Sequence, residues 1–437
     1  MPKRAPGPVG LPLSGNYIHL WRNILSLMLS TRERYGDVVR FRLGARILHV
    51  VSHPDLVRHV MLSHRENYDK TARSSQQIKH LAGMSLLVSN GADWQVKRRL
   101  LQPAFKINTV AAYFNLMREL AEASTTNAGA RTVDVAALMS HLTYRVVGLA
   151  LMSDDLIATG DDVQRAMAHT LRHMYRRINY RALPLWVPTP GNLRFKRERQ
   201  RLHQIVAAIL RKRSDGTGPS DLLGEMIAAK DGDKDHSLNE TWLRDEVVTL
   251  LIAGHETTAN ALTFCLCLLA KHPTIQQRVY AEISQVIGDR PLRPADIDAL
   301  TYTYCVFQEA LRLYPPIWAM ERLVKQDDVL AGYDIAKGST LLVGIYTMHR
   351  HPEFWRDPAV FDPERFAGNE KNPAYLPFGL GPRMCLGMNF ALQEAMIILV
   401  TLLQRFELID AMARDIEPDP GITLRMRGAV PLQLKLR

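Results

Sequence analysis

Cys385 has the most distinctive chemical setting of any residue in this 437-residue chain. It lies in a glycine-spaced loop, residues 378–387, and the apolar segment that follows predicts a helix over 389–406. Free backbone N–H groups and the helix dipole favour an anion where such a loop becomes a helix. We therefore expect the pKa of the cysteine to be lowered, which stabilises the thiolate that acts as a nucleophile or metal ligand. A lone cysteine is otherwise most often a small buried apolar residue, so the interpretation depends on the rest of the chain.

A carboxylic acid and an alcohol stand side by side at Glu256 and Thr257. Ala253 and Gly254 precede them and leave room for a small ligand, and the glycine and threonines weaken the helix-forming tendency of the segment. His255 lacks the second histidine, four residues later, that a zinc-protease motif requires. An acid–alcohol pair remains, and such a pair can order the waters that carry protons to a metal-bound dioxygen. The alternative is a core helix in which the threonines hydrogen-bond back to helix carbonyls.

Trp94 and Arg98 form an aromatic and cationic pair four residues apart. The segment predicts a helix opened by an Asp or Asn cap, so both side chains share one helix face. Taken alone, the pair is more typical of an ordinary amphipathic helix. In a buried cleft, the paired N–H donors of a guanidinium suit a carboxylate.

The surrounding pattern predicts the elements that position these residues. Residues 38–43 and 46–51 predict a β-hairpin around a Gly-Ala turn. Residues 237–240 have the spacing of a capping box, and they open an apolar helix that should stop at His272-Pro273. At about 32 residues, this helix would be roughly 48 Å long, enough to cross a whole domain.

Helical periodicity also dominates the chain from residue 110 to about residue 213. It is interrupted at residues 183–191, which are rich in proline and in aromatic or aliphatic side chains. This loop either covers an apolar cavity or simply connects two helices.

Composition predicts a soluble globular chain with a core large enough to enclose a cofactor, since 47% of its residues are hydrophobic and 23% are charged. The chemical motifs extend from residue 94 to residue 387, so we expect residues 1–437 to form one domain, although length alone suggests about three. The four cysteines lack the spacing of a disulfide framework, which favours a reducing cytoplasm. The longest uncharged stretch, 257–270, is shorter than the roughly 18 residues of a membrane span, so none is expected.

The formal net charge of +11 raises the question of an anionic partner. The positive residues are distributed in small clusters along the chain, as expected for solvated helix faces. Neither a helix-turn-helix pattern nor zinc-finger spacing is found, so nucleic acid is not the expected partner.

The loop around Cys385 resembles the haem-ligating signature of the cytochrome P-450 family, F-x-x-G-x-R-x-C-x-G, at every fixed position. Residues 253–258 resemble the oxygen-activating helix of that family, A-G-x-(D/E)-T-(T/S). W-x-x-x-R at residues 94–98 resembles its propionate-binding segment. In this family, an E-x-x-R sequence and a further arginine form a structural network behind the haem. Glu309 and Arg312 match the E-x-x-R sequence, and Arg365 matches the further arginine.

The resemblance implies a mostly α (α+β) fold, with a large helical domain and a smaller β-rich N-terminal region. It implies haem b (iron protoporphyrin IX) as the cofactor and Cys385 as the iron ligand, and it assigns proton delivery to Glu256 and Thr257. The remaining residues that the resemblance places against the haem or its propionates are Trp94, Arg98, Ala253, Arg322, Phe378 and Arg383.

The activity implied is that of a monooxygenase of secondary metabolism, which inserts one oxygen atom of dioxygen into a C–H or C=C bond. We expect an apolar pocket built from residues 78–87, 250–257, 317–320 and 422–423. Its substrate would be a hydrophobic small molecule such as a terpenoid, a fatty acid or a polyketide-like compound. Alternatives are peroxide-driven oxidation or isomerisation, a haem carrier or sensor without catalysis, and a helical interaction protein without haem.

We expect electrons to come from a separate protein, because only about fifty residues follow Cys385. We expect a ferredoxin or flavodoxin with its NAD(P)H-dependent reductase. Lys97 and Arg99, which flank Arg98, are expected to attract this acidic partner to the cysteine side. The protein is expected to be a cytoplasmic monomer.

Overall fold

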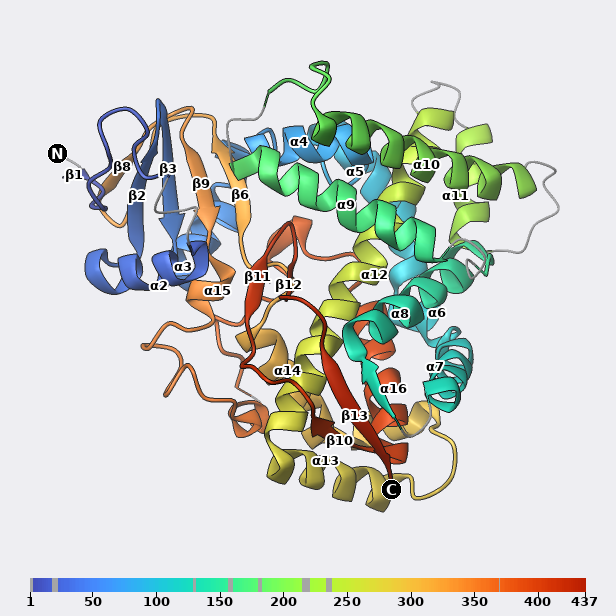
Figure 1. Cartoon of the computed structure of the whole chain (residues 1–437). Helices are drawn as coiled ribbons and strands as arrows, with labels where there is room; N and C mark the ends of the chain where they lie inside the picture. Colours follow the sequence, from blue (N-terminus) through green and yellow to red (C-terminus); the bar gives the residue numbers. More distant parts are fainter. Residues whose placement is uncertain are drawn as a thin grey trace.

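A long central helix organises the molecule. α12 (Glu240–Lys271) has 32 residues and runs through the middle of the helical part of the chain (Figure 1). The side chain of Asn239 caps it by accepting a hydrogen bond from the backbone N–H of Trp242, and His272 ends it. The expected length and stop of this helix are confirmed. The capping residue is Asn239, and Ser237 of the expected capping box lies outside the described residues.

The structure is a computed structural model, and it describes residues 3–17, 23–128, 131–155, 160–179, 183–213, 221–232, 238–368 and 370–437. Helices that pack directly on α12 include α8 (Val135–Met152), α14 (Thr301–Leu313) and α16 (Met388–Arg405). Further helices are α2 (Ile24–Tyr35), α3 (Pro54–Arg58), α4 (Arg73–Ala82), α5 (Gly91–Leu101), α6 (Ile107–Ala111), α7 (Phe114–Ala128), α9 (Gly160–Asn179), α10 (Pro190–Lys212), α11 (Leu222–Asp231), α13 (Pro273–Val286) and α15 (Ile345–Met348).

α8 is the one helix of the described chain that is long and apolar enough to cross a membrane. Of its residues, 61% are buried inside the molecule, where α8 packs along α12. A helix that is apolar around most of its circumference is expected where protein surrounds it on most sides. Its composition is therefore that of a core helix.

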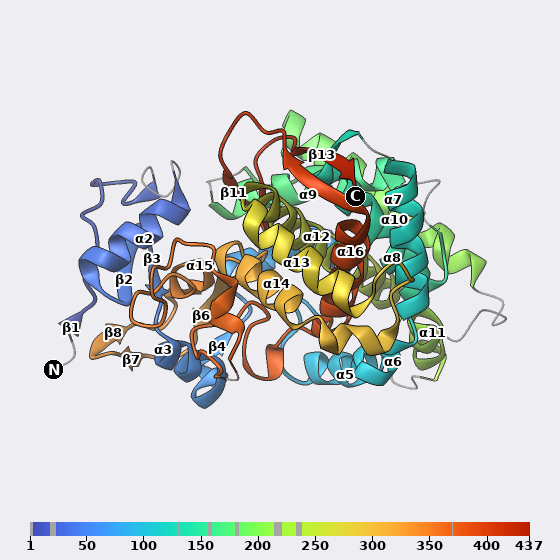
Figure 2. The ribbon, with the colours of Figure 1, turned by 90° about the horizontal axis from the view of Figure 1, so that it is seen from below.

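A five-stranded sheet lies to one side of the helices, with strand order β2-β3-β9-β6-β4 (Figures 1 and 2). β2 and β3 pair antiparallel from Val38–Val51 to Leu43–Arg46, which confirms the predicted hairpin. β9 then pairs parallel with β3 and antiparallel with β6. The strands of this sheet are β2 (Val38–Leu43), β3 (Arg46–Val51), β4 (Tyr68–Asp69), β6 (Met320–Val324) and β9 (Thr340–Val343).

The fold is mostly helical with a smaller β-rich region, as predicted. The β-rich region is not purely N-terminal, because strands from residues 320–343 complete the sheet that the N-terminal hairpin begins. Three small sheets contain the other strands, β1 (Lys3–Arg4), β5 (Thr132–Asp134), β7 (Asp328–Leu330), β8 (Tyr333–Ile335), β10 (Phe406–Asp410), β11 (Pro418–Pro420), β12 (Leu424–Met426) and β13 (Pro431–Leu436).

The loop before α10 does not cover the central cavity. Trp186 is 77% exposed and Leu183 is 57% exposed, and neither lines the cavity described below. Thr189 caps α10, whose first residue is Pro190. Of the two interpretations of this proline-rich segment, the plain connection fits the described residues.

Candidate active site

A cavity of about 700 Å³ lies between α12 and the loop that leads into α16. This volume is in the range of sites that bind small molecules. Residues from all four segments expected to form a pocket, 78–87, 250–257, 317–320 and 422–423, line it. So do all the predicted site residues, namely Trp94, Arg98, Ala253, Glu256, Thr257, Arg322, Phe378, Arg383 and Cys385.

Cys385 opens into this cavity from the loop before α16. Its backbone N–H donates to the carbonyl of Phe378 at 2.9 Å, which closes the loop. Gly381 has a φ of +76°, and a Cβ there would lie 2.7 Å from the carbonyl oxygen of Met61, so the turn requires glycine. Cys385 is exposed to the cavity, whereas the other three cysteines are buried in packed helices.

The expectation that this position lowers the pKa of Cys385 is wrong for the polypeptide alone. Enclosure by the cavity wall raises the pKa of the thiol. The backbone N–H of Gly387 and the guanidinium of Arg98 offset this effect only in part. A metal cation at Sγ would supply the missing stabilisation, since a thiol that coordinates a metal is deprotonated.

Ala253, Glu256 and Thr257 lie on the part of the wall that α12 forms. Ala253 is exposed in the middle of a core helix because it faces the cavity. The hydroxyl of Thr257 donates to the carbonyl of Ala253 at 2.7 Å, so the back-bonded arrangement considered from the sequence is present. Oε2 of Glu256 has no hydrogen-bond partner within the described chain.

The environment of Glu256 shifts its pKa upward. Burial raises the pKa of its carboxyl group, and a hydrogen bond with Thr423 and the charge of Arg425 act in the opposite direction. No hydrogen bond between Glu256 and Thr257 is found among the described residues. The acid and the alcohol are therefore neighbours on one helix that meet the cavity separately.

The helix is continuous at 253–258, so the expected weakening produces no interruption in it. A Cβ on Gly254 would lie 2.8 Å from Cγ2 of Val147 in α8, so glycine here allows close helix packing in addition to any room for a ligand. His255 is buried on the α8 side, where Ser140 Oγ lies 3.3 Å from its Nε2, and burial lowers its pKa to about 4. Its place confirms that it belongs to the packing of the helices.

Cationic side chains gather at the other end of the cavity. Arg98 donates to the carbonyl of Met384 at 3.0 Å, and Arg383 donates to the carbonyl of Ser89 at 2.7 Å. Arg322 is 5% exposed, and burial lowers its pKa to about 10. Within the part of the chain that is described, neither Arg98, Arg322 nor Arg383 forms an ion pair with a carboxylate.

Trp94 is held against this cationic group. Its ring lies 4.3 Å from Cζ of Arg383, which is the geometry of a cation–π contact. Asn90 caps α5, as an Asn or Asp was expected to do, but its side-chain oxygen accepts from Nη2 of Arg383 at 3.0 Å instead of from a helix N–H. The start of α5 thus orients the arginine that faces the cavity.

A family model for cytochrome P450 matches residues 5–435. The chain belongs to the cytochrome P450 family. Among its relatives is the cyclooctat-9-en-7-ol 5-monooxygenase of Streptomyces melanosporofaciens, 36% identical over 96% of this chain and 90% of the relative. The cyclooctatin synthase of the same organism is 35% identical over 96% of this chain and 93% of the relative. The pentalenene oxygenase of Streptomyces avermitilis is 32% identical, with coverages of 99% and 96%.

This cytochrome P450 is therefore a bacterial-type monooxygenase, an oxidoreductase of secondary metabolism whose cofactor is haem. The residues present fit that cofactor. Among the residues that the structure describes, Arg322 and Arg383 have no carboxylate partner; they face a largely apolar cavity, and this cavity also exposes the thiol of Cys385. A flat apolar ring with two carboxylates and a central iron matches each of these features.

Lys70 is a further member of the cationic group that sequence reasoning missed. It lines the cavity, and its Nζ donates to the carbonyl of Leu87 at 3.0 Å. Burial and the nearby charges of Arg322 and Arg383 lower the pKa of Lys70. It follows the two-residue strand β4, which pairs with β6. No local motif marks it, because only the pairing of distant strands brings it beside Arg322.

The network of Glu309, Arg312 and Arg365 is formed as the resemblance implied. Oε2 of Glu309 accepts from Nε of Arg312 at 2.6 Å, and Oε1 lies 3.4 Å from Nε of Arg365. Glu309 and Arg312 are fully buried and Arg312 also donates to the carbonyls of His349 and Pro358 at 2.8 Å. These contacts fix the segment that precedes the cysteine loop rather than the cavity itself.

Lys97 does not belong to an exposed docking surface. It is 3% exposed, its Nζ donates to Oδ2 of Asp93 at 2.8 Å, and it also bonds to the carbonyl of Met84. Its position on α5 is typical of a surface lysine, but the loop before α5, which includes Met84, covers the Lys97 side chain. Arg99 is exposed.

Proposed function

We propose that this cytochrome P450 inserts one oxygen atom of dioxygen into a C–H or C=C bond of a terpenoid bound in the main cavity. The observation that supports the proposal is that one apolar cavity is lined both by the thiol of Cys385 and by the acid–alcohol pair Glu256 and Thr257. The relatives are named for cyclooctat-9-en-7-ol, cyclooctatin and pentalenene, and these names favour a terpenoid over a fatty acid or a polyketide-like molecule.

Cys385 Sγ is the proposed iron ligand, with Phe378 and Ala253 in contact with the haem. Arg98, Arg322 and Arg383, together with Trp94, are the proposed partners of the propionates, because guanidinium groups offer paired donors to carboxylates. When bound, the haem supplies the iron centre at which dioxygen is activated.

Burial raises the pKa of the Glu256 carboxyl group, which favours its role as a proton donor. Thr257 already donates to Ala253, yet its hydroxyl oxygen keeps lone pairs that can accept from a water molecule. A water held between Thr257 Oγ1 and Glu256 Oε2 would let the acid deliver its proton on the α12 side of the cavity. Apolar residues of the wall, such as Leu250 and Ile317, exclude other water.

Electrons are proposed to come from a ferredoxin or flavodoxin served by an NAD(P)H-dependent reductase. Arg99 is exposed and lies beside Arg98, which is proposed to bind a propionate. Of the two expected docking residues, Arg99 is accessible to a partner and Lys97 is buried. We further infer that the chain acts as one domain and as a monomer in the cytoplasm.

The experiment that tests this function combines a spectrum with product analysis. Purified holoprotein is reduced under carbon monoxide, and we expect the Soret band of a thiolate-ligated haem. It is then supplied with pentalenene or cyclooctat-9-en-7-ol, a ferredoxin system, and isotopically labelled dioxygen. Incorporation of one labelled oxygen atom is the expected result.

Two outcomes would replace the proposal with another. Product formed only with hydrogen peroxide, or an isomer without labelled oxygen, would favour the non-monooxygenase activities of a haem-thiolate protein. A thiolate spectrum with substrate binding but no product from any tested terpenoid would favour a carrier or sensor.

A further inference from the structure

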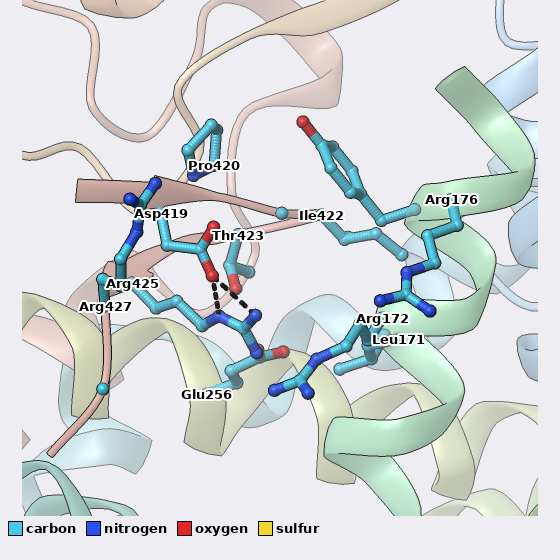
Figure 3. A pocket seen from close by; sticks show the side chains of 13 residues that line it. Leu171, Arg172, Arg176, Glu256, Asp419, Pro420, Ile422, Thr423, Arg425 and Arg427 are labelled. Carbon is cyan, nitrogen blue, oxygen red and sulfur yellow. Dashed lines mark hydrogen bonds and ion pairs between the residues drawn. The ribbon is translucent and has the colours of Figure 1, made fainter. Parts of the chain in front are cut away.

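A second, polar cavity of about 720 Å³ adjoins the main cavity. It lies between α9 and the hairpin of β11 and β12, and Figure 3 shows its residues. Glu256, Ile422 and Thr423 line both cavities, so the two spaces meet at these side chains. A molecule in the main cavity can therefore extend one end into the polar cavity.

Four arginines surround the polar cavity. Arg172 and Arg176 project from α9 towards the hairpin that carries Arg425 and Arg427 (Figure 3). Arg425 is paired with Asp419, whose Oδ2 accepts from Nη2 at 2.7 Å and from Nε at 3.1 Å.

Carboxylates balance only the two arginines of the hairpin. Arg427 lies 3.5 Å from Oε2 of Glu417. Neither Arg172 nor Arg176 forms an ion pair or hydrogen bond with a side chain of the described residues. The α9 side of the cavity therefore has a net positive charge.

The charges on Arg172 and Arg425 repel each other across the cavity. The pKa of Arg172 is lowered, with Arg425 as the largest cause, ahead of burial, while Asp419 acts in the opposite direction. At the floor of the cavity, burial raises the pKa of Glu256, which disfavours the carboxylate that would offset the arginines. An anion between the two arginine pairs would remove this repulsion.

We propose that the polar cavity binds an anionic head group, a carboxylate or a phosphate, of an otherwise apolar substrate whose body lies in the main cavity. This inference rests on the proposed function and specifies its substrate class. Guanidinium groups suit either head group because they offer paired N–H donors to two oxygens. The arginines stand on a helix and on a paired hairpin, so their spacing is fixed by the fold.

This head-group site also bears on which carbon is oxidised. An anion held by Arg172 and Arg425 lies beside Glu256, next to the residues that separate the two cavities. The apolar body must then pass Ile422 to reach the main cavity. A fixed end limits how the body can slide, so one region of the molecule is presented for reaction.

The test compares matched ligands that differ in the head group only. Holoprotein is titrated calorimetrically with abietic acid and its methyl ester, and with geranylgeranyl phosphate and geranylgeraniol. We expect the anionic member of one pair to bind about tenfold or more tightly than its neutral counterpart, and the pair that shows the preference assigns the head group. The double variant Arg172→Gln/Arg176→Gln should lose this preference while neutral ligands keep their affinity within about twofold.

Arg356→Gln is the control for the single variant Arg172→Gln, because Arg356 is 94% exposed, lies outside both cavities, and its replacement removes one positive charge in the same way. The inference is overturned if neither acid is preferred, if the preference survives in the double variant, or if Arg356→Gln abolishes it equally. It is also overturned if the double variant alters only the pH profile of turnover of a neutral substrate, because the arginines would then act on Glu256. The carbon monoxide spectrum, recorded on the same samples, distinguishes each of these results from a failure of the proposed haem chemistry.

Discussion

The guanidinium of Arg383 lies over the indole ring of Trp94, with Cζ 4.3 Å from the ring centroid. The same guanidinium donates to Ser89 and Asn90, so α5 and the loop before it aim the charge of Arg383 at the cavity. The loop that carries Cys385 and the helix that carries Arg98 are thereby joined on one side of the cavity. Residues far apart in the chain form one cationic wall beside the thiol.

Replacing Arg383 should weaken the hold on haem. Arg383→Gln removes one charged donor that faces the cavity, and we expect haem transfer to a scavenging apoprotein to be faster by about tenfold or more. The thiolate spectrum of the protein that retains haem should be unchanged. Arg356→Gln serves again as the control of equal charge change. An unaltered rate of haem loss would contradict the assignment of Arg383 to a propionate.

Cys385→Ser should abolish the thiolate-type spectrum of the reduced carbon monoxide complex and the monooxygenase activity. The fold should persist, because the thiol faces the cavity. Circular dichroism and the spectrum are the measurements. Cys305→Ser changes a cysteine of α14 outside the cavity and should keep the spectrum. A serine variant with full activity would refute the ligand assignment.

Thr257→Val should reduce product formation by about a hundredfold, the typical contribution of a group that assists proton transfer. Substrate affinity, measured by calorimetry, should change little, because the methyl groups keep the shape of the side chain. Thr263→Val is the control, since Thr263 makes the same 2.7 Å bond to the carbonyl four residues earlier but lies away from the cavity. If both variants lose activity equally, the effect belongs to helix stability rather than to proton delivery.

Charge reversal at Arg99 tests the docking of the redox partner. Arg99→Glu should slow turnover with an acidic ferredoxin, most strongly at low ionic strength, because exposed charges are screened by salt. Turnover driven by a small chemical reductant should not change. Lys97→Glu is unsuitable for this purpose, since Lys97 is buried against Asp93 and Met84. A partner rate that is independent of salt and of Arg99 would place the docking surface elsewhere.

Features that depend on residues close together in the chain could be predicted from the sequence. They are the cysteine loop, the α12 motif, and the helix and hairpin boundaries. Lys70 was not readable, since it reaches Arg322 only through the pairing of β4 with β6. The burial of Lys97 was missed for a similar reason, because the loop that covers it carries no pattern. The pKa of Cys385 was predicted in the wrong direction because the enclosure of the thiol depends on the whole cavity.

The polar cavity shows the same limit. No motif in the sequence distinguishes Arg172 and Arg176, and Arg425 lies about 250 residues away. Only the folded chain places the hairpin of β11 and β12 opposite α9 (Figure 3). The sequence therefore predicts the cofactor, and the folded structure adds the cluster of charges on which the proposed head-group site rests.

Glu246 ties α12 to the loop between α4 and α5, and it should make stability depend on pH. Oε1 accepts from the backbone N–H of Leu86 at 2.7 Å, and Glu246 is 1% exposed. Burial raises its pKa from 4.5 to about 7. The folded chain thus binds this proton more tightly than the unfolded chain, so the stability it contributes is complete below about pH 4.5 and is lost as the pH rises through about 7.

Once Glu246 is fully ionised, the free energy of unfolding is expected to be lower by about 3 kcal/mol than at low pH. Urea unfolding between pH 5 and pH 8 measures it, and Glu246→Gln should flatten the difference while keeping an acceptor for Leu86. Glu240→Gln, at the exposed start of the same helix, should leave the pH dependence as it is. A Glu246→Gln protein with the same pH slope as the parent would show that Glu246 is already ionised when folded, with Lys97 as the nearby charge that stabilises it.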